Sequence, residues 1–277
     1  MFQIKRLEKI KDIETVETIE QQIWKKPPTP FHQTYTASKN GGLVLGAYKN
    51  EKLVGFQYSF SGFKNGESYL CSHMLGILPD YQKNGLGYEM KLVQQKLALE
   101  MGYSLIVWTF DPLESVNAYL NLHKLKGIGA TYLENHYGTM KDSLNQGLPT
   151  DRFLVEWWIR SEHVTKGNKG YEEQPFTPML ETELTKEGFP TIIGENNRKA
   201  DQRVVYVPVP ENIQQMKKEQ PELAKEWRFK TREIFRALCQ EGYIAEDVKR
   251  DTNKRISYYM FKKRHHLPLN NVEEETT

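Results

Sequence analysis

The sequence has few cysteines and no long apolar run. Cys71 and Cys239 are the only two cysteines among its 277 residues, and their separation fits neither a zinc site nor a redox motif. We therefore expect both to be reduced core residues, and we expect no metal site. No apolar run reaches the length of a membrane span, and the first residues lack the apolar core of a signal peptide. These absences predict a cytoplasmic protein without a membrane partner.

The sequence also lacks an excess of charge of either sign. Its 38 basic and 36 acidic residues give a net charge of +2, whereas proteins that bind nucleic acid usually concentrate basic residues on one face. We therefore expect no nucleic-acid partner. Hydrophobic residues make up 38% of the chain, which is enough for a buried core in one large domain or two modest ones.

The most informative stretch that is present covers residues 68–101. An apolar run at 69–78 has the composition of a buried strand, and Pro79 ends the pairing because it has no N–H to donate. The loop at 82–87 reads Gln-Lys-Asn-Gly-Leu-Gly and precedes apolar residues at helical spacing. Glycines before a helix let a ligand approach the N–H groups at the positive end of the helix dipole. The stretch predicts a strand, an anion-binding loop that would fit a diphosphate, and a helix.

The sequence at 82–87 does not match two other kinds of phosphate-binding loop. A Walker loop needs Lys and then Ser or Thr after its last glycine, but the two glycines of this loop are followed by Leu86 and Tyr88. A dinucleotide fingerprint that began at Gly85 would need its third glycine at Met90. Two interpretations stay open, an anion loop of the form Gln-x-x-Gly-x-Gly and a glycine-rich turn that binds nothing.

The loop and its surroundings resemble the GNAT family of acyl-CoA-dependent N-acyltransferases. Leu78-Pro79 followed by the loop at 82–87 is similar to the pyrophosphate-binding motif of that family. Other segments extend the resemblance to a bacterial GNAT subfamily that has a long C-terminal extension. These segments are 72–75 (Ser-His-Met-Leu), 108–113 (Trp-Thr-Phe-Asp-Pro-Leu), 117–122 (Asn-Ala-Tyr-Leu-Asn-Leu), 137–138 (Tyr-Gly) and 148–152 (Leu-Pro-Thr-Asp-Arg).

The resemblance implies that acyl-CoA, either acetyl-CoA or succinyl-CoA, is the co-substrate. It also implies an α/β (α+β) GNAT fold, in which a mixed central sheet with two splayed parallel strands is flanked by helices. The gap between the splayed strands exposes backbone groups to which the pantetheine amides of CoA can bind. The residues that the resemblance implies for CoA binding are Gly76, Ile77, Leu78, Gln82, Lys83, Asn84, Gly85, Leu86, Gly87, Asn117 and Asn121.

The expected elements follow the order of this fold, and the chain is expected to divide into three parts. The pattern predicts strands at 2–7, 42–49, 52–63, 69–78, 103–110, 131–135 and 153–159, helices at 13–24, 88–101 and 115–126, and a loop at 29–40. Residues 1–160 would form the GNAT domain, and 161–191 would be a polar linker. Residues 192–277 would form a strand, helix, strand, strand extension that contributes to the acceptor pocket.

His73 is the first candidate for the general base or proton relay. Imidazole titrates near neutrality, and the residue lies on the strand that should flank the thioester. A core histidine is the open alternative, and Glu156 and Asp111 are the next candidates for the base. Backbone N–H groups around residues 74–76 could bind the oxyanion of the tetrahedral intermediate.

The sequence offers more than one candidate for the acid that protonates the leaving thiolate. Many GNAT proteins use a tyrosine on the helix after the second splayed strand, but an alignment on Ala118 places Leu122 at that position. Either Tyr119 or Tyr137 substitutes for it, or the thiolate leaves without a protein acid.

Three arginines of the C-terminal extension recur at four-residue spacing. Arg228, Arg232 and Arg236 would share one helix face, and only Arg236 has an acid within one turn, Glu233. We therefore expect an anion from elsewhere, either a carboxylate of this chain or a carboxylate of the acceptor or acyl group. Arg152 is a similar candidate.

These observations predict an N-acyltransferase that moves an acetyl or succinyl group from CoA to the amine of a small carboxylate-bearing acceptor such as an amino acid. Some relatives in the resembled subfamily are associated with N-succinylation of amino acids, which would need such arginines. The alternatives are acetyl transfer to a peptide or antibiotic amine, and a CoA-binding or CoA-sensing relative without turnover. A homodimer is an open possibility.

Overall fold

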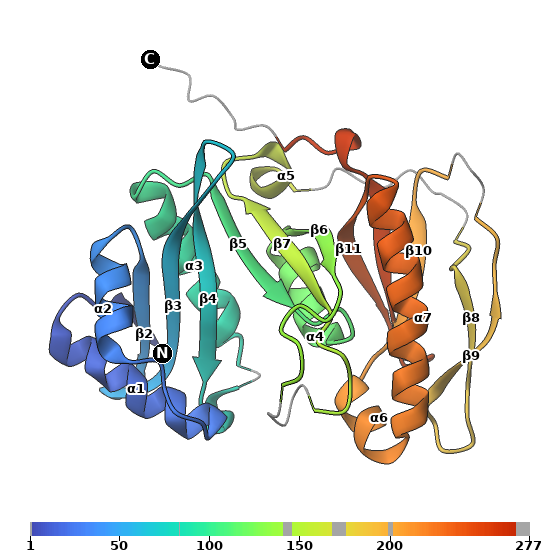
Figure 1. The fold of residues 1–277 in the computed structure, drawn as a ribbon, viewed down its shortest axis with the longest axis horizontal. Helices are drawn as coiled ribbons and strands as arrows, with labels where there is room; N and C mark the ends of the chain where they lie inside the picture. The colour runs from blue at the N-terminus through green and yellow to red at the C-terminus, as the bar shows by residue number, and fades with distance from the viewer. Residues whose placement is uncertain (1, 83, 141–145, 168–175, 199–201, 270–277) are drawn as a thin grey trace. The chain divides into compact units, whose positions relative to one another are not determined.

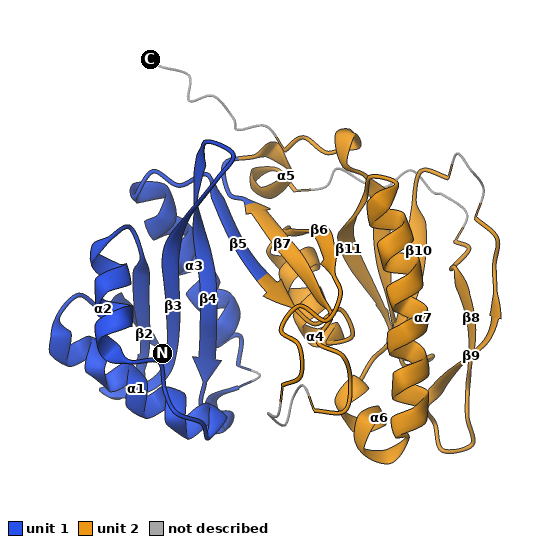
Figure 2. Ribbon diagram, in the orientation of Figure 1, with its two compact units in different colours: residues 1–108, 158–160 blue, residues 109–157, 161–277 orange. Residues whose placement is uncertain are grey.

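The chain forms two compact units in a computed structural model that describes residues 2–82, 84–140, 146–167, 176–198 and 202–269 (Figure 1). Unit 1 contains residues 1–108 and 158–160, and unit 2 contains residues 109–157 and 161–277 (Figure 2). The compact units thus divide within the segment 1–160 that we expected to be one domain. The chain leaves unit 1 at Trp108, inside the predicted second parallel strand.

Unit 1 is a mixed sheet flanked by helices. Its elements are β1 (Gln3–Arg6), α1 (Ile10–Trp24), α2 (Phe31–Lys39), β2 (Leu43–Lys49), β3 (Lys52–Lys64), β4 (Glu67–Ile77), η1 (Pro79–Tyr81), α3 (Leu86–Glu100) and β5 (Leu105–Phe110), whose last two residues belong to unit 2. The strands follow the order β1-β2-β3-β4-β5, and β4 and β5 are parallel while the other neighbours are antiparallel. This order confirms the predicted mixed α/β fold for the first half of the chain.

The two faces of this sheet differ in chemistry, because alternate residues of β3 point to opposite sides. Phe56 and Tyr58 belong to a hydrophobic cluster with Ile13 of α1. Gln57 and Ser59, which alternate with them, are fully buried and form hydrogen bonds on the side of α3. The sheet is therefore sealed by apolar packing on one face and by a buried polar layer on the other.

Unit 2 combines an antiparallel sheet with one long helix. Its elements are α4 (Ser115–Ala118), the π-helical segment η2 (Tyr119–Lys124), β6 (Ile128–Leu133), β7 (Arg152–Trp158), α5 (Glu162–Thr165), β8 (Leu180–Leu184), β9 (Pro190–Glu195), β10 (Val205–Pro210), α6 (Ile213–Glu219), α7 (Pro221–Gln240), β11 (Tyr243–Asp251), β12 (Ile256–Lys263) and η3 (Arg264–His266). The strands follow the order β7-β6-β11-β12-β10, and β8 and β9 form a separate hairpin. The strand, helix, strand, strand order predicted for the extension is present as β10, α6 with α7, β11 and β12.

Aromatic side chains fill the space between α7 and this sheet. Phe235 of α7 lies 5.1 Å from Phe153 of β7 and 5.2 Å from Tyr259 of β12, measured between ring centroids. The indole of Trp227 is fully buried and donates a hydrogen bond to the carbonyl of Pro190 at 2.8 Å, which ties α7 to β9. Burial of large rings of this kind is the main source of stability for such a layer.

The structure corrects three expectations about secondary structure. Residues 31–39, expected in a loop, form helix α2. The segment 161–191, expected as a linker, contains α5, β8 and the start of β9, while its residues 168–175 lie outside the described part of the chain. The helix expected at 115–126 is a single α-turn followed by π-helical geometry to Lys124. In the described part of the chain, no helix has both the length and the apolar character needed to cross a membrane.

The buried side chain of His163 should make the stability of unit 2 depend on pH. Its side chain is buried in α5, and burial, followed by the charge of Lys126, lowers the pKa of His163 to about 4. Between pH 6.5 and pH 4 the unfolded chain therefore binds a proton that the folded chain does not bind, so stability falls as the pH falls. We expect this residue to cost about 2 kcal/mol between pH 7 and pH 5. Urea unfolding of His163→Leu should show a correspondingly smaller loss.

The matched control for this prediction is His32→Leu, because His32 is exposed on α2. This variant should keep the pH dependence of the wild type. If His163→Leu lost as much stability between pH 7 and pH 5 as the wild type does, proton binding at His163 would not be the cause.

Candidate active site

The predicted anion loop lies between the end of β4 and the start of α3 in unit 1. After η1, the side-chain amide of Gln82 donates a hydrogen bond to the carbonyl of Ile77 at 2.9 Å, which ties the loop to the end of the strand. Gly85 has a φ of +77° and directly precedes the first residue of α3. Lys83, which the resemblance implies for CoA binding, lies outside the described residues.

The first turn of α3 presents backbone N–H groups at the loop. The first intrahelical hydrogen bonds run from the N–H groups of Tyr88 and Glu89 to the carbonyl of Gly85, at 3.0 and 3.1 Å. The N–H groups of Leu86 and Gly87 come earlier in the helix than any such bond, as helix geometry requires. They lie at the positive end of the helix dipole, where an anion is stabilised.

The two glycines of the loop are there for different reasons. Gly85 needs its left-handed backbone conformation, and among the described residues other than its chain neighbours no atom lies within 4 Å of the position that a Cβ would take. Gly87 has an ordinary backbone, and a Cβ there would lie 3.6 Å from the Cδ1 of Ile77, which is a normal contact. Internal packing therefore does not require glycine at 87, whereas the close approach of a ligand would.

β4 carries a bulge at His73. The register with β3 pairs Met74 with Tyr58 and then Ser72 with Ser59, so that His73 is the additional residue on β4. The parallel register with β5 contains two residue pairs, Leu70 with Ile106 and Cys71 with Val107. Beyond Cys71, β4 continues for six residues to Ile77. The predicted separation of the two parallel strands thus begins at the bulge.

The bulge places the His73 ring at the surface of unit 1 beside two aromatic rings. The ring centroids of Tyr58 and Phe60 lie 6.0 and 5.6 Å from that of His73. Burial, with a smaller contribution from Lys26, lowers the pKa of His73 below its usual value, and Glu20 opposes this shift. The imidazole is therefore neutral at physiological pH, which is the form that a general base needs.

The other predicted catalytic residues belong to unit 2. Tyr137 is half exposed, and its hydroxyl forms a hydrogen bond of 2.8 Å with the hydroxyl of Thr109. The ring of Tyr119 stacks on His123 at 4.5 Å and has the guanidinium of Arg250 on it at 4.0 Å. Tyr137 is therefore the more exposed of the two tyrosines, and its hydroxyl has a fixed partner.

Three other candidates of unit 2 have partners within the unit or differ in exposure. Glu156 accepts a hydrogen bond from Arg264 at 2.6 Å, so an ion pair accounts for this carboxylate. Asn117 is exposed, whereas Asn121 is buried. The backbone carbonyl of Asn121 accepts a hydrogen bond from the N–H of Gly127 at 2.9 Å. Of the two asparagines, only Asn117 presents its side chain to solvent.

The anions expected for the arginines of α7 are carboxylates of this chain. Arg228 is fully buried, and its Nη2 lies 2.6 and 2.5 Å from the two oxygens of Asp111. Arg232 donates two hydrogen bonds to Asp151, at 2.8 and 2.7 Å. The open alternative of a tertiary salt bridge is thus observed for both, and Arg228 presents no surface to a substrate.

Asp151 and Asp111 also involve Arg152. Burial opposes ionisation of Asp151, but hydrogen bonds from Arg232 and Tyr132 outweigh it and lower the pKa of this carboxyl below its usual value. The Nη1 of Arg152 donates to the backbone carbonyl of Asp151 at 2.8 Å and lies 3.7 Å from the carboxylate of Asp111. Its guanidinium also lies over the ring of Tyr137 at 5.4 Å.

The buried polar layer behind β3 and β4 was missed by sequence analysis. Lys91 of α3 is 4% exposed and joins Gln57, Ser72 and Gln94 through hydrogen bonds. The helix prediction relied on apolar residues such as Leu92, which is in fact exposed. The buried positions of α3 are Leu86, Met90, Lys91, Gln94 and Ala98. The available signal was Gln94, a polar residue that lies four residues after Met90 and four before Ala98 in an otherwise apolar stripe.

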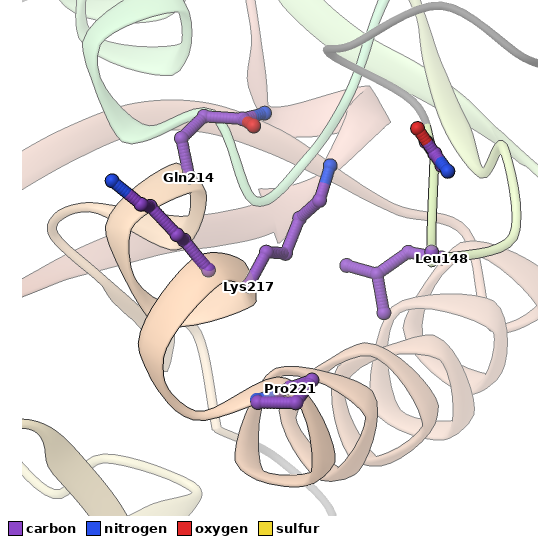
Figure 3. Close-up of a pocket in the computed structure, with 7 residues that line it drawn as sticks. Leu148, Gln214, Lys217 and Pro221 are labelled. Atoms are coloured by element: carbon purple, nitrogen blue, oxygen red, sulfur yellow. The ribbon is translucent and has the colours of Figure 1, made fainter.

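A pocket of about 300 Å³ lies in unit 2, near α6 and the start of α7 (Figure 3). Leu148, Gln214, Lys217 and Pro221 are among the residues that line it. None of the residues predicted to bind acyl-CoA or the acceptor lines this pocket. It is therefore not part of the candidate site.

Solved structures similar to this chain are acetyltransferases. They include the ribosomal-protein-S18-alanine N-acetyltransferase from Escherichia coli, with a TM-score of 0.46 and 19% identity over 64% of this chain and 100% of that chain. A putative acetyltransferase from Salmonella typhimurium, solved with its cofactor acetyl-CoA, has a TM-score of 0.46 and 14% identity over 63% and 98%. An acetyltransferase of the GNAT family from Streptococcus pneumoniae has a TM-score of 0.45 and 14% identity over 56% and 98%.

Other comparisons add no relative. No family model matches the sequence, and no curated protein matches it either. The comparison with solved structures is the one that finds similar proteins. Because these identities and TM-scores are low, we base the proposed function on the residues of this chain.

The loop can be tested by changing the charge at Gly85. Asn and Asp have the same shape, and both tolerate a positive φ better than other side chains do. If the loop binds the diphosphate of CoA, Gly85→Asp should weaken CoA binding about 100-fold, because it brings a carboxylate to within roughly 5 Å of the phosphates. Gly85→Asn should bind CoA within about threefold of the wild type. Equal affinities for both variants in calorimetry would show that the diphosphate binds elsewhere.

The buried pair of Arg228 and Asp111 predicts a loss of stability rather than a change in substrate binding. Arg228→Met leaves the carboxylate of Asp111 without its closest partner and should lower the free energy of unfolding by about 3–5 kcal/mol. The double variant Arg228→Met/Asp111→Asn should regain part of this loss in urea unfolding. Unchanged stability together with a raised acceptor KM would instead assign Arg228 to the substrate.

Proposed function

We propose that this chain is an acyl-CoA-dependent N-acyltransferase of the GNAT type. The observation that carries the proposal is the sequence of features along β4 of unit 1. The strand is bulged at His73, loses its parallel partner after Cys71, and leads through a tied loop into the glycine-flanked N-terminus of α3. Each feature supplies one requirement for holding a thioester of CoA.

The diphosphate of CoA would bind at the start of α3. The N–H groups of Leu86 and Gly87 and the positive end of the helix supply donors and charge for it, together with the loop residues 82–85. The pantetheine arm would take backbone groups of β4 beyond Cys71 that β5 does not pair. The carbonyl of Ile77 and the N–H of Leu78 are not among them, because they bind Gln82 and the carbonyl of Val54. The resemblance to GNAT proteins implies that the side chains of Asn117 and Asn121 bind this arm. Of the two, the exposed Asn117 fits that role better.

Acyl transfer requires a neutral amine, an oxyanion site and a proton for the thiolate. His73 would accept the proton of the attacking amine, directly or through water, because its lowered pKa keeps it unprotonated. The amine forms a bond to the thioester carbonyl carbon, and a backbone N–H of residues 74–76 would stabilise the oxyanion. Collapse of the intermediate breaks the carbon–sulfur bond and releases CoA as a thiolate or thiol.

Tyr137 is the residue of unit 2 that we propose as the acid for this thiolate. Its hydroxyl is held by Thr109, so that its direction is fixed, and its ring is half exposed. Tyr119 and Glu156 are weaker candidates, since the first is stacked between charged or aromatic groups and the second is paired with Arg264.

The acceptor that we propose is a small amine with a carboxylate, such as an amino acid, and the acyl group is acetyl or succinyl. Arg152 is also buried, but its guanidinium lies over the ring of the half-exposed Tyr137, and we assign it to the carboxylate for this reason. Arg228 and Arg232 would stabilise this site through their ion pairs with Asp111 and Asp151. Acetyl transfer to a peptide or antibiotic amine is the alternative within this class. A cytoplasmic location and a homodimer remain predictions.

A second candidate function is CoA binding without turnover. It is favoured by Leu122, which is fully buried at the position where GNAT proteins carry their tyrosine. Release of free thiol separates the two functions when it is measured with acetyl-CoA and succinyl-CoA against a panel of amino acids. Tight CoA binding without thiol release from any pair would support the second candidate.

The role of His73 predicts a loss of turnover in His73→Gln. The kcat should fall about 100-fold while CoA affinity stays unchanged, because the side chain serves the proton transfer and not the diphosphate. The wild-type rate should rise with pH through an apparent pKa below 6.5, and the variant should lack this limb. The exposed His265 gives the matched control, and His265→Gln should keep both rate and pH profile. A full rate in His73→Gln would contradict the assignment.

A further inference from the structure

Lys91 is a buried lysine on α3, the helix that begins at the end of the loop. Its Nζ donates hydrogen bonds to the hydroxyl of Ser72 at 2.9 Å and to the side-chain carbonyl of Gln94 at 3.3 Å. The same nitrogen lies 3.6 Å from the centre of the Trp108 ring. With 4% of the residue exposed, these contacts replace water almost completely.

The groups around Lys91 are almost all neutral. On β3 the polar layer ends in Gln57 and Ser59, which bind Ser72 and Gln94 in turn. No carboxylate of the described residues forms an ion pair with Lys91. The titratable group that does face it is the thiol of Cys71 on β4, whose pKa is raised by burial. A buried ammonium without a counter-ion is costly, so burial lowers the pKa of Lys91 to about 7, against a smaller opposing effect of Cys71.

The position of Lys91 on α3 couples it to the loop. Its Nζ lies beside Ser72, five residues before Ile77 at the end of β4, and Gly87 in the first turn of α3 lies beside Ile77. An anion at the first turn of α3 would thus be about 15 Å from the ammonium group. At an effective dielectric constant near 20, each phosphate charge at this distance changes an equilibrium constant by roughly sixfold. Salt screens a buried charge much less than an exposed one.

We propose that Lys91 is a buried countercharge for the diphosphate of CoA, and that CoA binding and protonation of Lys91 favour each other. This inference rests on the proposed function, because it requires CoA at the loop. It adds a binding determinant that never touches the ligand and that lies under the sheet rather than on the surface. The missing carboxylate partner in the polar layer is then explained, since the ligand supplies the negative charge.

The direction of the pH dependence follows from linkage. An anion at the loop raises the pKa of Lys91, so that CoA binding takes up part of a proton at a pH slightly above 7. The affinity is greatest at a pH at which Lys91 is already charged in the free protein. The affinity falls as the pH rises through the range in which Lys91 is protonated in the complex but not in the free protein. It levels off once Lys91 is neutral in both.

The test is calorimetric titration of the full chain with CoA between pH 6 and pH 9, in two buffers of different ionisation enthalpy. The wild type should take up roughly half a proton near pH 7.5 and bind CoA about tenfold more weakly at pH 9 than at pH 6. Lys91→Met should bind about tenfold more weakly than the wild type at pH 6 and equally at pH 9, without proton uptake near pH 7.5. Comparison of the two proteins cancels the titration of the phosphates and thiol of CoA itself.

Lys96→Met is the matched control, because it removes the same charge from an exposed position of the same helix. It should keep the wild-type affinity, pH dependence and proton uptake. CoA binding to the wild type without proton uptake, or with the same pH dependence in Lys91→Met, would overturn the role of Lys91 and leave the proposed function standing. Absence of CoA binding to the wild type at every pH would overturn both. If Lys91→Met does not fold, Lys91→Gln takes its place in the same comparison, with the same expected loss of proton uptake.

Discussion

The bulge at His73 is the constraint on which the candidate site of unit 1 depends. One additional residue on β4 changes the register with β3, and the parallel ladder with β5 extends no further than Cys71. Backbone N–H and C=O groups of the remaining strand are then not used by that ladder, although the carbonyl of Ile77 accepts a hydrogen bond from Gln82. The same irregularity brings the imidazole of His73 to the surface beside two aromatic rings, and burial together with Lys26 lowers its pKa.

The polar layer under the sheet and the loop above it act through one helix. α3 begins at the loop with N–H groups that no intrahelical bond uses, and its second turn contributes Lys91 to the buried layer. Ser72, the immediate neighbour of the bulge, accepts hydrogen bonds from both Lys91 and Gln57. The polar layer therefore contacts both the helix that begins after the loop and the strand that carries His73.

The sequence predicted the features that local chemistry determines. The loop at 82–87 was predictable because a positive φ at Gly85 and helical spacing after it are local properties. Helix α2 was not, because its first residue is held by a contact with another element, the hydrogen bond from the backbone N–H of Phe31 to Glu17 of α1. The partners of Arg228 and Lys91 were also hidden, since Asp111 is 117 residues away in the chain and Ser72 is 19 away. Only the fold brings such groups together.

The central claim is that the first turn of α3 holds the diphosphate of CoA, and a crystal structure of the complex with CoA tests it most directly. The account predicts that the N–H groups of Leu86 and Gly87 lie within hydrogen-bond distance of the phosphate oxygens and that the pantetheine arm follows β4 beyond His73. A complex in which CoA binds elsewhere, or in which protein atoms occupy these N–H groups, would contradict it.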